Sequence, residues 1–264
     1  MAHRLPEEPS ELGPLTHDAI AGDFRITQRK YGHRYSIDDV LTAQIAASAR
    51  PQAARCLELG SGIGSVLLML AYRLPQASFV AVEAQRNSFQ LLVHNVAQNG
   101  LTQRVTTLHG DLREQVTPEL GSFDLITGTP PYVLPGQATP STDAQRAFAR
   151  QEYRGGVEDY VLAASRVLAR GGSLSVCCDA RRPDRVEQAA LHSGLGIVSQ
   201  CDVFPRSGRA ALFSVFTLEH APATVQRAHI TFTARTQTGA RTEQYLALRE
   251  FFGMSRPSDE APSP

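Results

Sequence analysis

Apolar positions follow two alternating spacings along the chain from about Arg55 onward. Short apolar or β-branched runs, typical of buried strands, occupy 55–59 (RCLEL), 78–83 (SFVAVE), 104–110 (RVTTLHG) and 123–128 (FDLITG). Stretches with helical spacing of apolar residues lie between them at 65–74 (SVLLMLAYRL) and 89–100 (FQLLVHNVAQNG). This alternation predicts parallel strands joined by right-handed helical crossovers.

The pattern resumes after a loop rich in Pro, Gly and Thr that runs from 129 to about 150. We predict helices at 158–172 and near 183–193, and strands at 173–179, 196–204 and 211–219. The segment SGRA (207–210) is short enough for a hairpin between the last two strands. The predicted fold is therefore α/β, with a doubly wound, mostly parallel, seven-stranded Rossmann-like sheet and an antiparallel edge hairpin.

Both ends of the chain lack this periodicity. Residues 1–20 are rich in Pro and Glu, and 254–264 are similar, so we predict disordered tails there. Between them we expect a single domain at 21–253 with an N-terminal extension. The length of 264 residues and the 42% of hydrophobic residues suit one sizeable core.

Composition narrows the functional classes. No apolar run approaches the roughly 20 residues needed to span a bilayer, and the start has no secretory signal, so we expect a cytoplasmic protein. The four cysteines lack CxxC spacing, so we expect buried thiols and no metal site. Lys plus Arg (26) equals Asp plus Glu (26), so any nucleic-acid surface must be a local patch.

A glycine-rich turn follows the first predicted strand of the sheet. It contains Glu58, Gly60, Gly62 and Gly64 and runs directly into a helix, as in turns where a ligand approaches the backbone. Glu83 ends the second strand, where a carboxylate can accept both ribose hydroxyls. The two features fit a nucleotide-containing cofactor. The spacing lacks the GxGxxG of dinucleotide sites and Glu58 precedes it, which favours S-adenosylmethionine over a dinucleotide.

Asp111 follows the third strand and so belongs to the same carboxyl edge of the sheet. It can accept a hydrogen bond from the adenine amino group of the cofactor, or it can cap the following helix.

The fourth strand ends in Thr129-Pro130-Pro131-Tyr132, a stiff turn with free carbonyl oxygens. It resembles the Asn-Pro-Pro-Tyr turn of class I methyltransferases that modify exocyclic amino or amide nitrogens. The resemblance implies that the first proline carbonyl and the Asn hold the target amino group while the aromatic ring stacks on the base. Pro130 and Tyr132 match, and Thr129 does not. A threonine hydroxyl accepts well only while its own proton is donated elsewhere, so we expect one acceptor to be weakened.

The resemblance extends over roughly residues 24–252. The stretch FRITQRKYGHRYSID (24–38) with Leu41, and VFPRSGRA (203–210), are similar to the bacterial adenine-N6 methyltransferases that act near the anticodon of a valine tRNA. This likeness implies that Gln28 and Asp38 lie near the cofactor pocket, although Asp38 could equally cap the helix at 39–49. It also implies tRNA as the partner.

Two alternatives remain open from the sequence. One is an N-methyltransferase of a protein glutamine amide or a small amine, and the other is a non-catalytic cofactor-binding module, because Thr129 departs from the motif. RNA binding requires a basic face, and the residues expected to cluster there are Arg25, Arg29, Lys30, Arg34, Arg146, Arg150, Arg154, Arg206 and Arg209. The modified position and the oligomeric state do not follow from the sequence.

Overall fold

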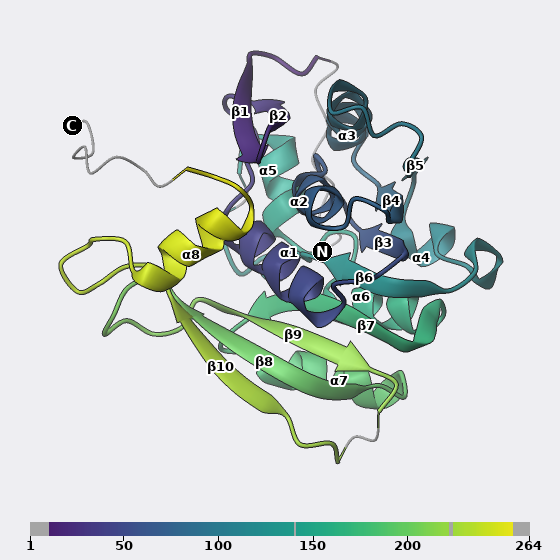
Figure 1. Cartoon of the computed structure of the whole chain (residues 1–264), viewed down its shortest axis with the longest axis vertical. Coiled ribbons are helices and arrows are strands. Elements are labelled where there is room, and N and C mark those ends of the chain that lie inside the picture. Colours follow the sequence, from purple (N-terminus) through teal and green to yellow (C-terminus); the bar gives the residue numbers. More distant parts are fainter. Residues whose placement is uncertain (1–10, 140, 222–223, 256–264) are drawn as a thin grey trace.

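The computed structural model describes residues 11–139, 141–221 and 224–255, and these form an α/β fold around one large sheet (Figure 1). Within these residues the sheet has eight strands in the order β10-β8-β9-β7-β6-β3-β4-β5. The strands are β3 (Arg55–Leu59), β4 (Ser78–Glu83), β5 (Val105–His109), β6 (Phe123–Gly128), β7 (Leu168–Asp179), β8 (Gly196–Phe204), β9 (Phe213–Glu219) and β10 (Ala228–Thr233). Neighbours from β7 to β5 are all parallel, whereas β9 is antiparallel to both β7 and β8.

Helices cover both faces of the sheet. They are α1 (Ile37–Ala49), α2 (Ser65–Arg73), α3 (Arg86–Gln98), α4 (Leu112–Gln115), the short 3₁₀ helix η1 (Pro118–Leu120), α5 (Ala144–Arg150), α6 (Val157–Ser165), α7 (Pro183–His192) and α8 (Glu243–Phe251). One buried cluster joins the sheet to α1, α2, α3 and α8, and a second joins it to α4, α6 and α7. Successive strand residues point to opposite faces, so Leu125 belongs to the first cluster and Ile126 to the second.

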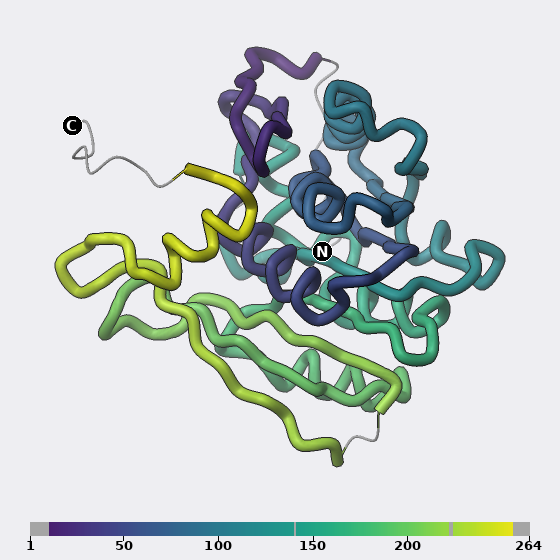
Figure 2. Tube along the Cα trace, viewed as in Figure 1, coloured from purple at the N-terminus to yellow at the C-terminus, as the bar shows by residue number. Residues whose placement is uncertain are grey.

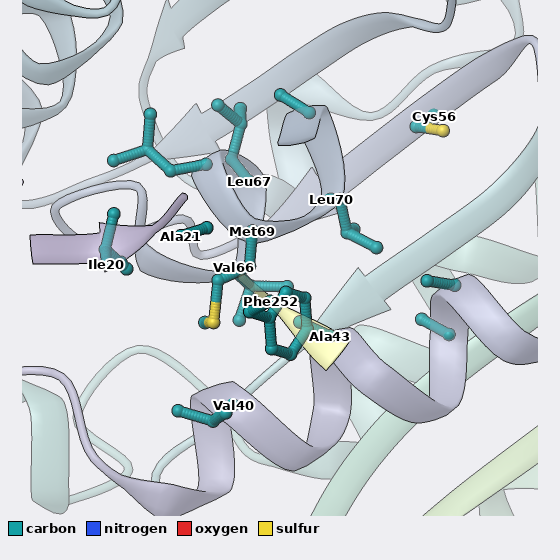
Figure 3. Close-up of a cluster of buried hydrophobic side chains, with 14 of the residues drawn as sticks. Ile20, Ala21, Val40, Ala43, Cys56, Val66, Leu67, Met69, Leu70 and Phe252 are labelled. Carbon is teal, nitrogen blue, oxygen red and sulfur yellow. The ribbon is translucent and has the colours of Figure 1, made fainter. Parts of the chain in front are cut away.

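An N-terminal hairpin of β1 (Leu15–Ala21) and β2 (Phe24–Arg29) stands beside the main sheet. Figure 3 shows Ile20 and Ala21 of this hairpin near side chains of α1 and α2 and near Phe252. The Gly22 amide donates to the Phe252 carbonyl (2.7 Å), so the turn of this hairpin contacts the residue that follows α8 (Figure 2). Residues 15–20 therefore belong to the folded domain, and the expected tail boundary at residue 20 is wrong; 1–10 and 256–264 lie outside the described residues.

Two further expectations need correction. The sheet gains an eighth strand, because β10 pairs parallel to β8 and takes the edge, with β9 lying between β7 and β8. Four of its six residues are exposed, so β10 lacks the apolar alternation by which a strand is recognised. The helix expected at 158–172 ends at Ser165, and β7 begins at Leu168. The glycine pair expected at a helix end lies instead in β7, where Gly171 has φ +82° and the pairing with β6 shifts register.

All four cysteines lie within the described residues, and each is buried and free, as the sequence predicted. No group of His, Cys, Asp and Glu in the described ranges has a metal-binding arrangement. Among the same residues, each helix is too short or too polar to cross a bilayer.

Candidate active site

A pocket of about 860 Å³ opens at the carboxyl edge of the parallel strands. It is lined by the turn after β3, the end of β4, the loop after β5 and the end of β6, together with residues 33–39, 148–149 and 154–160. The chain passes from β3 to β4 and β5 on one side and then returns to place β6 on the other side of β3. The pocket thus lies at the topological switch point, where open α/β sheets bind their ligands.

The three glycines of the turn share a left-handed backbone conformation but differ in what surrounds them. Gly60, Gly62 and Gly64 all have left-handed φ values, of +59°, +57° and +86°. A Cβ on Gly60 would overlap the Tyr160 hydroxyl, and one on Gly64 would lie 2.8 Å from Leu92, so a side chain at either position would force its neighbour to shift. A Cβ on Gly62 would meet no atom of the described residues within 4 Å, and Gly62 lines the pocket. The turn is therefore open to a ligand at Gly62.

Glu83 ties this turn to the end of β4. Its Oε2 accepts from the Gly62 amide (2.7 Å) and its Oε1 from the Gln85 amide (2.6 Å), and its side chain lines the pocket. Glu83 therefore fixes the turn at the pocket wall.

Glu58 lies on β3, behind the pocket rather than in its lining. Its side chain is buried, and Oε2 has no hydrogen-bond partner among the described residues. Burial and then the neighbouring Asp39 raise the pKa of Glu58 well above its usual range. Glu58 thus lies beneath the pocket in surroundings that favour its neutral form.

Asp111 caps α4, which is one of the two roles that the sequence left open, and it also lines the pocket. Its carboxylate accepts from the Arg113 amide (2.9 Å) and from the Arg113 guanidinium (2.6 Å). Hydrogen bonds from Arg113 hold the pKa of Asp111 below its ordinary value. The carboxylate is therefore anionic at the pocket wall.

The Thr129-Pro130-Pro131-Tyr132 turn forms the end of the pocket next to α1. Thr129 and Pro131 line it, while Pro130 is buried. The Thr129 hydroxyl donates to Asp39 Oδ1 (3.4 Å). Tyr132 does not belong to the pocket lining that the described residues form. Its hydroxyl donates to Asp38 Oδ2 (3.2 Å) and lies 2.9 Å from Cys177 Sγ. Tyr132 thereby fastens the turn to α1 and β7.

Gln28 and Asp38 do not reach the pocket in the described structure. The Gln28 side chain is 1% exposed and is held between Asp18 (2.9 Å) and the Tyr35 amide (3.2 Å). Asp38 lies in the first turn of α1, whose N-cap is Ser36, so the alternative that Asp38 is the cap is wrong. The Asp38 carboxylate instead accepts from the Tyr132 hydroxyl.

Asp39 is the pocket residue that sequence reasoning missed most clearly. It lines the pocket with 7% exposure, and its Oδ2 accepts from the Ser36 amide (2.9 Å). Burial, followed by the neighbouring Asp38, raises the pKa of Asp39 to about 7. The available signal was the sequence Ser-Ile-Asp-Asp, because an acidic residue three positions after a serine cap accepts from the cap amide. Other lining residues that were missed are His33, Tyr35, Ser65, Phe148, Arg154 and Tyr160.

The pocket fits a nucleoside cofactor with a positively charged group. It offers three carboxyl groups, backbone at an open glycine turn, and apolar walls. An open α/β sheet with this pocket, followed by a Pro-Pro turn at the end of β6, defines a class I methyltransferase.

Comparison with known proteins agrees with this class. The family model described as methyltransferase small domain matches residues 39–200. A tRNA1(Val) (adenine(37)-N6)-methyltransferase from Tolumonas auensis is 27% identical over 241 residues, 89% of this chain and 96% of the relative. The enzyme of the same name from Aeromonas hydrophila is 32% identical over 60% of this chain and 66% of the relative. The crystal structure of a predicted O-methyltransferase from Agrobacterium tumefaciens superposes with a TM-score of 0.62 at 19% identity, covering 83% of this chain and 98% of that one.

The chain belongs to the methyltransferase small domain family. It is a methyltransferase that uses S-adenosylmethionine, as the glycine spacing and the preceding Glu58 predicted.

Proposed function

We propose that the protein transfers the methyl group of S-adenosylmethionine to the exocyclic N6 of an adenine in tRNA. The observation that carries this proposal is the position of Thr129 and Pro131 in the pocket wall, because nitrogen-methylating enzymes place the target amino group at this turn. The relatives from Tolumonas auensis and Aeromonas hydrophila are named for adenine-N6 methylation of tRNA, which favours this acceptor over a protein amide. We place the reaction in the cytoplasm, and we assign it to one domain.

The cofactor would bind along the carboxyl edge. Glu83 would accept from the ribose hydroxyls, Asp111 from the adenine amino group, and Gly60 and Gly62 would offer their backbone. The sulfonium supplies an electrophilic methyl group. Glu58, Gly64, Gln28 and Asp38 would support these contacts from outside the pocket lining.

The acceptor amino group would lie at the Thr129-Pro130 end. The Pro130 carbonyl and the Thr129 hydroxyl would accept its hydrogens and free the nitrogen lone pair for in-line attack. Tyr132 would stack on the adenine, since its hydroxyl is anchored while the residue remains partly exposed. Positioning of this kind supplies most of the rate enhancement.

The basic residues expected at an RNA surface are distributed unevenly. Arg29 and Arg34 are engaged in ion pairs with Asp143 (2.9 Å) and Asp18 (2.9 Å). The Arg25 amide is bonded to Asn99, where α3 ends, and Arg25 does not line the pocket. The remaining candidates for a patch around the pocket are Lys30, Arg146, Arg150, Arg154, Arg206 and Arg209.

Mass spectrometry of nucleosides tests the proposal. Purified protein, labelled cofactor and unmodified tRNA should yield labelled N6-methyladenosine, and tRNA from a strain lacking the protein should lose that nucleoside at one position. The Glu83→Ala variant serves as the matched control. Label recovered in protein glutamine, or tRNA unchanged by the deletion, would replace the RNA acceptor with another amine.

A further inference from the structure

Asp39 and Thr129 contact each other inside the pocket, at the end proposed for the acceptor. Asp39 belongs to the first turn of α1 and Thr129 follows β6, 90 positions later, and both line the cavity. The Thr129 hydroxyl donates its only proton to Asp39 Oδ1, so the lone pairs of Oγ1 are available to an acceptor amino group. The other oxygen of Asp39 is held by the Ser36 amide, which fixes the carboxyl group. The structure thus identifies the group that receives the threonine proton.

We propose that Thr129 and Asp39 form a proton relay that removes the proton released when the target nitrogen is methylated. This inference rests on the proposed function, because it takes an amino group as the acceptor. Thr129 is the group that touches the substrate, and Asp39 acts through it.

Transfer to an adenine amine balances in atoms and in charge. The N6 lone pair attacks the methyl carbon, the N–C bond forms, and the C–S bond breaks with its electron pair staying on sulfur. The nitrogen becomes cationic and passes one proton to Thr129 Oγ1, while the hydroxyl proton of Thr129 moves to Asp39 Oδ1. The products are a neutral methylated amine, a neutral thioether and a neutral Asp39 carboxylic acid, which later returns its proton to water through the pocket mouth.

The surroundings of Asp39 suit this role. Asp38 on α1, Glu58 on β3 and Cys177 on β7 all interact with Asp39 electrostatically, and the hydroxyls of Ser65 on α2 and Thr129 hydrogen-bond to it. Their balance with burial leaves Asp39 with a pKa of about 7, where a general base is most effective at neutral pH. A cationic cofactor bound in the pocket would lower the pKa of Asp39 and keep its carboxylate ionised before transfer, and loss of the positive charge would favour proton uptake by Asp39 afterwards.

The Asp39→Asn variant tests the relay directly. Asn keeps the size of the side chain and an oxygen for the Ser36 amide, but it cannot take up a proton. Under single-turnover conditions with saturating tRNA, we expect the rate to fall about 100-fold or more, while the KM for tRNA changes little. The wild-type rate should rise with pH to a plateau that is reached below about pH 7, because the bound cofactor lowers the pKa of Asp39, and the variant should lose this ionisation. A wild-type rate and pH profile in Asp39→Asn would overturn the relay.

Two substitutions at Thr129 provide the matched pair. Thr129→Ser keeps the hydroxyl and should retain most of the rate, whereas Thr129→Val keeps the shape without the hydroxyl and should be as slow as Asp39→Asn. The double variant should be no slower than either single one, because the two residues act in one path. If the Asp39 and Thr129 substitutions instead slow the reaction additively, the two residues do not act in one path and the relay is wrong. His33→Gln should leave the pH profile intact; if that variant instead abolishes the ionisation, His33 is the base and the relay is wrong.

A binding experiment separates this inference from the proposed function. Calorimetry of S-adenosylmethionine binding near pH 7, in two buffers of different ionisation enthalpy, should show proton release by the wild type and none by Asp39→Asn. S-adenosylhomocysteine, which lacks the positive charge, should release fewer protons. Equal proton release in both proteins overturns the relay, whatever the acceptor. Normal proton release with no methyl transfer to any tRNA would instead overturn the tRNA assignment.

Discussion

At the scale of single residues, the carboxyl groups of the pocket divide into two kinds. Glu83 and Asp111 receive backbone amides and, for Asp111, a guanidinium, and such contacts favour the anionic form. Asp39 and Glu58 are buried close to each other, and burial favours their neutral form. The side of the pocket that would hold the nucleoside, with Glu83 and Asp111, is therefore anionic. The carboxyl groups of Asp39 and Glu58, near the proposed acceptor end, can change their protonation.

The first prediction at this scale concerns cofactor binding. Glu83→Ala removes the acceptor for the Gly62 and Gln85 amides and the proposed ribose contact, so cofactor affinity should fall about ten- to a hundredfold. Glu83→Gln keeps one oxygen and should weaken binding less. Isothermal calorimetry measures both, with circular dichroism to establish that the variants are folded. An unchanged dissociation constant in folded Glu83→Ala would remove this side chain from the cofactor site.

The second prediction concerns stability and pH. The folded pKa of Asp39 is raised from 3.8 to about 7, so the folded state favours the proton more than the unfolded state does. The stability that this group contributes is therefore full below about pH 4 and is lost as the pH rises toward about 7. Asp39→Asn removes this dependence, and at pH 8 the variant should be more stable than the wild type. Urea denaturation at pH 5 and pH 8 tests this; a stability difference independent of pH would contradict the raised pKa.

At the scale of elements, the strands with strong apolar runs were predictable and those without were not. The bounds of β3, β4 and β6 coincide with the runs RCLEL, SFVAVE and FDLITG, because these buried parallel strands are apolar on both faces. β10 is mostly exposed, and β1 alternates weakly, so tertiary pairing rather than local pattern defines both. Asp39 escaped prediction for a similar reason, since only the packing of α1 against β6 brings it to Thr129.

One buried side-chain amide, that of Asn95, joins the N-terminal hairpin to the rest of the domain. Asn95 on α3 accepts from the Thr27 amide (2.8 Å) and donates to the carbonyls of Thr27 (3.0 Å) and Ile63 (2.8 Å), so it joins β2 to the glycine turn. It is fully buried.

The third prediction follows from this junction. Asn95→Ala leaves three buried backbone groups without partners, and the free energy of unfolding should fall by about 3 kcal/mol or more. Asn99→Ala is the matched control, because Asn99 bonds to Arg25 at an exposed site where water replaces it. Chemical denaturation of both variants tests the difference. An equal fall in both variants would mean that burial of the junction contributes little.

At the scale of the whole molecule, the sheet places distant basic loops along one edge. β9 is antiparallel to β7 and to β8, and β7 is parallel to β6, so β8 runs in the direction of β6. The loop between β8 and β9 therefore follows the same edge as the Thr129 turn, three strands or roughly 14 Å away. With zero formal net charge, attraction to RNA must come from such a local arrangement.

The last prediction tests that arrangement. Arg206 and Arg209 are exposed or partly exposed in the β8–β9 loop, and an RNA that reaches the pocket along this edge would pass over them. Replacing both by alanine should weaken tRNA binding and reduce the slope of log affinity against log salt by about 0.7 to 0.9 for each phosphate that the variant no longer binds. The rate of transfer at saturating tRNA should stay unchanged, because neither residue lines the pocket. Arg25→Ala, which changes an exposed arginine on β2, is the matched control and should leave affinity and salt slope as they are. Filter binding across a salt series measures both, and a slope that falls with Arg25→Ala rather than with the double variant would place the RNA over β2 instead of over the β8–β9 loop.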